Sequence, residues 1–330
     1  MTDPIGGTRP ADALPDTWHP APQPVRDASL PARVRVYEVG PRDGLQAEPE
    51  ILPAAVKAEF CRRLLDAGVS ALEVTSFVPP RWVPQLADAE EVVAQVGDVP
   101  GRRLVSLVPN LRGLERALAA GVTEVAVVVS ATESFARANL NNTVRGAIDA
   151  ASDVAAAAAD RGVPVRGYVS MSFGDPWEGP VPHERVATIA AELAGAGAAA
   201  IALGDTIGTA TPSHIERVVN LTADAGVPRE ALALHLHDTY GQALGNVQAG
   251  LRAGVTEFDA STGGLGRCPY AKGATGNLAT EDLVWLLHGL GIETGLDLEQ
   301  LVRTTQWMSR RLGRPLPSRV AAALTAAGVA

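Results

Sequence analysis

Short, continuously apolar runs alternate with longer helical segments along most of this chain. The runs are apolar at nearly every position, which is typical of parallel strands that are buried on both faces. After Pro53, by contrast, Val56, Phe60 and Leu64 recur at every fourth position, so this segment is predicted to bury one face of a helix. We expect eight strands, at residues 33–39, 71–75, 103–108, 124–129, 164–170, 199–203, 231–237 and 256–261.

Glycine recurs at the predicted junctions between a helix and the next strand, at Gly68, Gly121, Gly162, Gly197 and Gly254. Glycine suits the left-handed residue that ends a helix. The repeated order of helix, glycine and strand implies parallel strands, and eight such units predict an α/β fold, the (β/α)8 or TIM barrel. An open doubly wound sheet is the alternative, but no G-x-G-x-x-G sequence follows the first strand.

Two segments flank the repeated units. Helical sequence continues from about residue 297 to the end, so the catalytic barrel domain is expected to span residues 32–330, including extra C-terminal helices. Residues 1–31 are rich in proline and are expected to form a flexible N-terminal tail. This tail has neither a basic start nor an apolar segment, so we do not expect it to be a signal or transit peptide.

The composition is that of a globular protein, with 46% apolar and 20% charged residues. A net charge of −9 argues against nucleic acid as a partner. No apolar stretch is long enough to cross a bilayer, so no membrane association is expected. The two cysteines cannot build a disulfide framework, which favours a reducing, cytoplasmic location; Cys61 lies within a predicted helix and is interpreted as a small core residue.

Chemistry in a barrel of this type takes place at the carboxyl ends of the strands. Arg42 and Asp43 follow the first strand and pair a cation with an anionic ligand, although Gly-Pro-Arg-Asp-Gly is also typical of an ordinary turn. His235 and His237 end the seventh strand, and residues two apart on a strand point the same way. Two convergent imidazoles favour a metal site over core packing. With a carboxylate the ligand set suits Mg²⁺ or Mn²⁺, and it also tolerates Zn²⁺.

The eighth strand is followed by a glycine-rich loop, residues 263–273, that carries Cys268. A thiol on such a loop, near cations, can act as an acid or base. The alternative is a flexible connection with an incidental cysteine. Asn277 follows the loop and is a candidate to supply an amide oxygen to the metal site.

Two further carboxylates satisfy the rule that functional residues lie at strand ends. Glu73 lies within an apolar run, and because a buried carboxylate needs a partner, we expect Arg42 on the neighbouring strand to pair with it. Asp205 follows the sixth strand; a role as a turn or helix-capping residue and a functional role are both open for it.

Several long motifs, in the same order, resemble those of hydroxymethylglutaryl-CoA lyases, members of a superfamily of metal-dependent lyases and synthases on TIM barrels. The likeness runs from about residue 34 to about residue 301. The motifs are Gly40-Pro-Arg-Asp-Gly-Leu-Gln46, Ser76-Phe-Val-Pro-Pro-Arg-Trp-Val-Pro-Gln85, Gly204-Asp-Thr-Ile-Gly208, His235-Leu-His-Asp-Thr-Tyr-Gly-Gln242, Gly264-Leu-Gly-Arg-Cys-Pro-Tyr-Ala-Lys-Gly273 and Asn277-Leu-Ala-Thr-Glu-Asp282.

This resemblance implies cleavage of 3-hydroxy-3-methylglutaryl-CoA, an acyl-CoA substrate, to acetyl-CoA and acetoacetate by an enzyme that is often a homodimer. It implies that Mg²⁺ or Mn²⁺ is bound by Asp43, His235, His237 and Asn277. It makes Arg42 a catalytic cation and Cys268 a proton-transferring thiol. It places Glu73, Asp205 and His235 near the reacting centre. One departure stands beside the thiol, where Arg267 replaces the family's usual glycine.

Three alternatives remain. A lyase for a longer branched substrate, of the isohexenylglutaryl-CoA type, would use the same residues in a different pocket volume. A Claisen-type synthase of the same superfamily would run in the bond-forming direction, but many of these carry a large C-terminal regulatory domain, which we do not expect here. A barrel that only binds acyl-CoA, without catalysis, would not need this set of reactive side chains.

Overall fold

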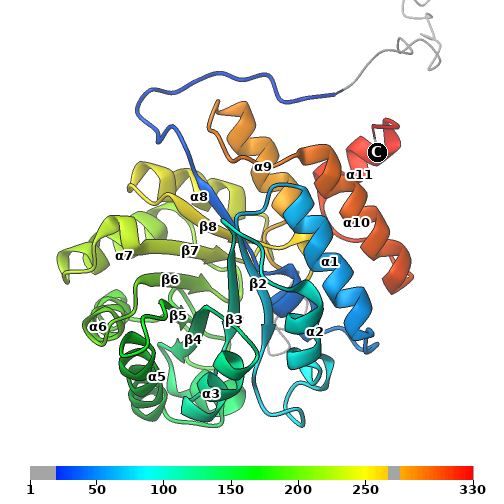
Figure 1. Ribbon diagram of the computed structural model, residues 1–330. Coiled ribbons are helices and arrows are strands. Elements are labelled where there is room, and N and C mark those ends of the chain that lie inside the picture. Colours follow the sequence, from blue (N-terminus) through cyan, green and yellow to red (C-terminus); the bar gives the residue numbers. More distant parts are fainter. Residues whose placement is uncertain (1–19, 267–275, 330) are drawn as a thin grey trace, which may run out of the picture.

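Eight parallel strands close into a barrel in the order of the sequence, with β8 paired to β1, in the computed structural model (Figure 1). The structure describes residues 20–266 and 276–329. The strands are β1 (Arg35–Glu38), β2 (Ala71–Ser76), β3 (Arg103–Leu107), β4 (Glu124–Ser130), β5 (Val165–Ser170), β6 (Ala200–Asp205), β7 (Leu232–Leu236) and β8 (Glu257–Ala260). Each lies within two residues of its predicted bounds, so the predicted (β/α)8 barrel is confirmed.

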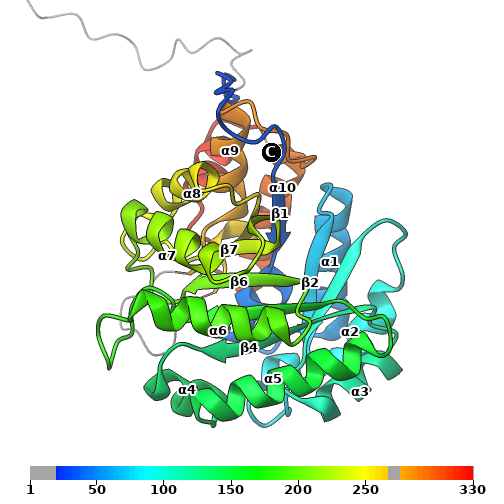
Figure 2. The same ribbon diagram turned by 90° about the vertical axis from the view of Figure 1, so that its left-hand side faces the viewer.

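Helices form a layer outside the ring of strands (Figures 1 and 2). They are α1 (Ala54–Asp66), α2 (Ala89–Val96), α3 (Leu111–Ala119), α4 (Glu133–Leu140), α5 (Val144–Ala159), α6 (His183–Gly195), α7 (Pro212–Asp224), α8 (Ala243–Arg252), α9 (Thr280–Gly289), α10 (Leu298–Leu312) and α11 (Arg319–Ala326). Short helical turns also occur at Gly40–Gly44, Pro84–Leu86, Arg229–Ala231 and Thr262–Gly264. Among the helices of the described residues, none combines the length and apolar character needed to traverse a bilayer.

Alternation along each strand divides the core into two parts. Val165 and Val169 of β5 belong to the large cluster between strands and helices. Tyr168, on the other face of the same strand, belongs to a smaller cluster inside the barrel with Tyr37 and Ala233. Residues at every second position therefore face the interior, which is the position of the two histidines of β7 and its end.

The predicted C-terminal helices pack against the first helix of the barrel. Figure 1 shows α10 alongside α1, where the rings of Phe60 and Trp307 lie 6.4 Å apart. Cys61 is fully buried in the same cluster, as expected for a core residue. On the N-terminal side, the Val25 amide donates to the Gly289 carbonyl and Leu30 is buried in the core.

Buried carboxylates connect the C-terminal helices to the mouth of the barrel. Glu281 of α9 accepts hydrogen bonds from the Gly263 amide and from the hydroxyl of Thr305 in α10. Glu38 of β1 accepts from the hydroxyls of Thr262 and Thr280 at 2.8 and 2.6 Å. The turn after β8 is thus anchored on both sides by acceptors that have no access to water.

We predict that the Glu281→Gln substitution changes how stability depends on pH. Burial raises the pKa of Glu281 to about 7, despite the opposing hydrogen bonds from Thr305 and Gly263. A glutamate in the unfolded chain titrates near 4.3, so between roughly pH 4.5 and 7 only the folded state keeps the proton, and stability falls as pH rises. The neutral glutamine does not titrate. The free energy of unfolding of the Glu281→Gln protein should therefore rise relative to that of the wild type by about 3 kcal/mol across this range.

Urea unfolding followed by circular dichroism at about pH 5, 6 and 8 measures this difference. The exposed Glu230 provides the control, since Glu230→Gln removes one carboxylate without touching the core. A constant difference between wild type and Glu281→Gln over the whole range would show that Glu281 does not carry the pH dependence.

Candidate functional site

The carboxyl ends of β1 and β7 and the segment after β8 meet at one mouth of the barrel. A cavity of about 1220 Å³ opens there, and Arg42, Asp43, His235 and His237 line it. This arrangement matches the rule that selected these residues, because parallel strands in a barrel direct their carboxyl ends to the same face.

A wide helical turn, Gly40–Gly44, presents Arg42 and Asp43 to this mouth. The amides of Asp43 and Gly44 both donate to the Val39 carbonyl, at 2.8 and 3.1 Å. A side chain at Gly44 would come within 2.8 Å of the Ser261 hydroxyl oxygen, so glycine lets the turn lie against the end of β8. The segment is therefore a single π-helical turn, a geometry that recurs at functional sites, instead of the ordinary turn that was the alternative.

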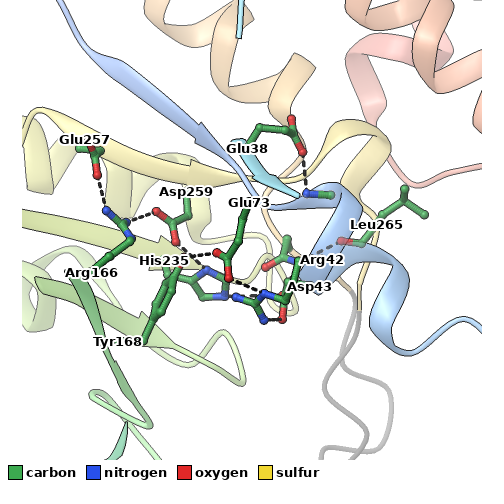
Figure 3. Close-up of polar contacts among 12 residues, drawn as sticks. Glu38, Arg42, Asp43, Glu73, Arg166, Tyr168, His235, Glu257, Asp259 and Leu265 are labelled. Carbon is green, nitrogen blue, oxygen red and sulfur yellow. Dashed lines mark hydrogen bonds and ion pairs between the residues drawn. The ribbon is translucent and has the colours of Figure 1, made fainter. Parts of the chain in front are cut away.

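Arg42 is held by two carboxylates (Figure 3). Its Nε donates to Glu73 Oε1 at 2.7 Å and its Nη1 donates to Asp43 Oδ1 at 2.6 Å. The predicted pairing of Arg42 with the buried Glu73 is confirmed. The Tyr168 hydroxyl donates to the second oxygen of Glu73 at 2.7 Å, so Glu73 has partners on both oxygens.

The two imidazoles point into the barrel, as the spacing predicts. Both are buried, and their ring centroids lie 5.3 Å apart. His235, His237 and Asp43 each offer a ligand atom, and these three atoms all lie within 4.8 Å of one another. Such convergence of two nitrogens and a carboxylate is what a divalent cation requires of its first ligands.

Asn277 joins this group through its backbone. It forms an antiparallel bridge with His237, and the Leu278 amide donates to the Leu236 carbonyl at 2.9 Å. The Asn277 Nδ2 donates to Asp43 Oδ2 at 2.8 Å. Four side chains from three separate parts of the sequence are therefore brought together, as proposed for the ligand set.

The electrostatics of the site keep Asp43 and His237 in the form that binds metal. Burial alone would raise the pKa of Asp43, but the Arg42 guanidinium and the imidazoles of His235 and His237 outweigh it and lower the pKa to about 2. Burial and the neighbouring His235 lower the pKa of His237 to about 4, so this ring is neutral at physiological pH. A carboxylate anion and a neutral imidazole are the species that coordinate cations.

Two buried polar atoms in this group support the presence of a further group. Asn277 Oδ1 and His237 Nδ1 have no hydrogen-bond partner among residues 20–266 and 276–329. Buried polar atoms normally have hydrogen-bond partners, and an atom without one is commonly explained by a bound ion or water. The donor set and these unpaired atoms fit a divalent metal ion.

The surroundings of Asp205 support the structural alternative. This side chain is 1% exposed and accepts from the amides of Thr209 and Ala210 at 2.9 and 3.0 Å, which closes the loop after β6. Burial raises the pKa of Asp205 to about 6, and those backbone donors oppose the rise. Its neighbours Gly204 and Thr206 line the cavity, so Asp205 shapes the wall of the site.

The predicted thiol, Cys268, and the neighbouring Arg267 lie outside the described residues. Their roles stay predictions.

The sequence reasoning missed Arg166 and Asp259, two buried charges inside the barrel. Arg166 forms ion pairs with Asp259 and Glu257, and Asp259 also lies 3.1 Å from His235 Nδ1. A signal was available, because Glu257 and Asp259 stand two apart on β8, the spacing that identified the histidines. A charged residue at an interior strand position requires a partner, as Glu73 does.

The comparisons with known proteins agree with this geometry. The HMGL-like family model matches residues 33–308. The mitochondrial hydroxymethylglutaryl-CoA lyase of Arabidopsis thaliana is 48% identical over 89% of this chain, which spans 63% of that protein's length. A Pseudomonas aeruginosa protein named 3-hydroxy-3-isohexenylglutaryl-CoA/hydroxymethylglutaryl-CoA lyase is 47% identical over 90% of this chain and 99% of its own.

Solved structures show the same similarity. A crystal structure of hydroxymethylglutaryl-CoA lyase from Pseudomonas aeruginosa has a TM-score of 0.88 and 46% identity, covering 91% of this chain and 99% of that one. An HMG-CoA lyase from Acinetobacter baumannii, in complex with coenzyme A and 3-methylmalate, has a TM-score of 0.85 and 35% identity, covering 91% and 97%.

We predict that Gly276→Ala weakens divalent metal binding. A Cβ at this position would overlap the carbonyl oxygens of Gly264 and Gly266, so the segment that carries Asn277 must shift. Loss of one correctly placed ligand should reduce Mn²⁺ affinity by about tenfold or more, measured by electron paramagnetic resonance of free Mn²⁺. The control is Gly289→Ala in α9, where the added Cβ meets nothing within 4 Å; equal affinity in all three proteins would mean that the position of Asn277 is unimportant.

Proposed function

The chain belongs to the HMGL-like family, and we propose that it cleaves 3-hydroxy-3-methylglutaryl-CoA to acetyl-CoA and acetoacetate. The observation that carries this proposal is the cluster of Asp43, His235 and His237 beside Arg42 at the mouth of a large cavity. The reaction removes a proton from the tertiary hydroxyl, breaks the adjacent carbon–carbon bond and leaves a thioester enolate, which then takes up a proton. A site for it must stabilise negative charge twice, first on the hydroxyl oxygen and then on the enolate oxygen.

We assign the metal to Asp43, His235, His237 and Asn277, and we propose Mg²⁺ or Mn²⁺ because oxygen donors make up half of this set. When bound, the ion acidifies the hydroxyl and orients the substrate. His235 contributes by holding the ion, because its other nitrogen already faces Asp259. Asn277 contributes the amide oxygen that has no partner among the described residues.

Arg42 is the group that we propose to stabilise the enolate. Its Nε and Nη1 are committed to Glu73 and Asp43, which leaves Nη2 without an acceptor in the described part of the chain. Arg42 lines the cavity, so this nitrogen is available to a carbonyl oxygen of the substrate. A donor fixed in advance stabilises charge that develops only in the transition state.

Glu73 acts on the reaction through Arg42. Its two oxygens are taken up by Arg42 and Tyr168, and it is fully buried, so it positions the guanidinium and does not reach the cavity itself. Asp205 positions the wall after β6 in a similar way. We propose Cys268 as the thiol that transfers a proton to or from the enolate carbon, in line with the family resemblance.

A longer branched substrate, of the isohexenylglutaryl-CoA type, is the second candidate. The cavity of about 1220 Å³ exceeds the range of about 300–1,000 Å³ that is usual for ligand sites. Part of its wall is apolar and is formed by Val78, Leu107, Val128 and Phe135. The relative from Pseudomonas aeruginosa carries both substrates in its name, and the same residues would serve either reaction.

We also propose a reducing cytoplasm and a homodimer as the working state. Cys61 is a buried free thiol, which suits a reducing compartment. Among the relatives, some are named as cytoplasmic and others as mitochondrial. Sedimentation velocity measures the number of subunits directly.

We predict that acetyl-CoA forms from hydroxymethylglutaryl-CoA with Mg²⁺, that EDTA abolishes the reaction, and that added Mg²⁺ restores it. The same assay with the isohexenyl substrate decides between the two candidates by the ratio of kcat/KM values. Release of acetyl-CoA is measured by coupling to citrate synthase. The proposal fails if neither substrate yields product, or if thorough chelation leaves the rate unchanged.

We predict that Arg42→Lys lowers kcat/KM by about 10³-fold, or about 4 kcal/mol of transition-state stabilisation, although the charge is kept. A lysine carries a single ammonium and cannot bind Glu73, Asp43 and the substrate in fixed directions at once. Arg161→Lys, at an exposed position in the segment between α5 and β5, is the matched control. Turnover close to that of the wild type would remove Arg42 from the mechanism.

A further inference from the structure

Arg166 of β5 is a fully buried cation in the interior of the barrel, away from the cavity lining. Its two terminal nitrogens form ion pairs with two carboxylates of β8, Nη1 with Glu257 and Nη2 with Asp259. The guanidinium also lies over the ring of Tyr37, 4.1 Å from the centroid. These contacts fix its plane, and they leave each carboxylate with one oxygen for another partner.

The second oxygens of the two carboxylates have different partners. Glu257 Oε2 accepts from Arg35 at 2.7 Å, toward the opposite end of the barrel. Asp259 Oδ2 lies 3.1 Å from His235 Nδ1, and Figure 3 shows Asp259 between Arg166 and His235. The contact follows from strand register, because His235 and Asp259 are paired neighbours on β7 and β8.

This contact determines which nitrogen of His235 carries the proton. A carboxylate only accepts hydrogen bonds, so Nδ1 must be the donor to Asp259. In the neutral ring the lone pair is then on Nε2, the nitrogen that lies 4.0 Å from Asp43 Oδ2. The contact with Asp259 thus turns Nε2 toward the other ligands, which is how carboxylates commonly support metal-binding histidines.

We propose that Asp259, held by Arg166, is a positioning residue that fixes the tautomer and orientation of His235 for the divalent cation. The inference rests on the metal site of the proposed function. Arg166 supplies the positive charge that a carboxylate with 1% exposure requires.

The decisive variant is Asp259→Asn. Arg166 can only donate, so the asparagine oxygen will face the guanidinium and its NH₂ group will face His235. The ring must then accept at Nδ1 and carry its proton on Nε2, which removes the lone pair from the metal. We expect Mn²⁺ affinity, measured by electron paramagnetic resonance, to fall by about 10- to 100-fold.

Glu257→Gln is the matched control. Glu257 is also a carboxylate of β8 that pairs with Arg166, but it has no contact with His235. This variant should bind Mn²⁺ within about threefold of the wild type, because Asp259, the partner of the His235 imidazole, is unchanged. If both variants lose affinity equally, the effect comes from disturbing Arg166 and the proposed role of Asp259 is overturned.

A second measurement needs no variant and decides the question if Asp259→Asn does not fold. Nitrogen chemical shifts of ¹⁵N-histidine in the Mg²⁺-loaded wild type distinguish a protonated Nδ1 from a protonated Nε2. We expect protonated Nδ1 at His235; a proton on Nε2 overturns the proposal. Wild type that binds no Mn²⁺ refutes the metal site itself, whereas wild-type affinity in Asp259→Asn refutes only the inference about Asp259.

Discussion

Two guanidinium groups, those of Arg42 and Arg166, are buried where little water can solvate their charge. In such surroundings an unpaired ion costs several kcal/mol, so carboxylates must accompany them. Glu73 pairs with Arg42, and Asp259 pairs with Arg166. Each ion pair occupies particular atoms of its two side chains, so it also determines which atoms remain for the cavity or for another side chain. The pairing that compensates buried charge therefore also orients the groups of the site.

Local rules were enough to predict much of this molecule. Continuous apolar runs located the strands, and the two-residue period placed His235 and His237 on one face. The need of a buried carboxylate for a partner predicted the contact between Glu73 and Arg42. Each of these rules acts within one strand or between strands that are consecutive in the chain, so the sequence carries them directly.

Features that depend on closure of the barrel were not accessible in the same way. The ion pair of Arg166 with Asp259 joins β5 to β8, which are not neighbours in the sheet, so it forms only in the interior of the closed barrel. The π-helical turn at Gly40–Gly44 packs against the end of β8, and nothing in its own composition predicts that geometry. The role of Cys268 and the division into a tail and a barrel domain stay predictions.

The hydrogen bond between Asp43 and Asn277 joins residues 234 positions apart, across the seam where the barrel closes. Closing a loop of this length costs chain entropy before the contact is made. If the contact forms after the rate-limiting step of folding, an ion shared by both residues acts mainly on the rate of unfolding. A bound metal would then leave the rate of folding nearly unchanged, slow the unfolding of the closed barrel and so lengthen its lifetime.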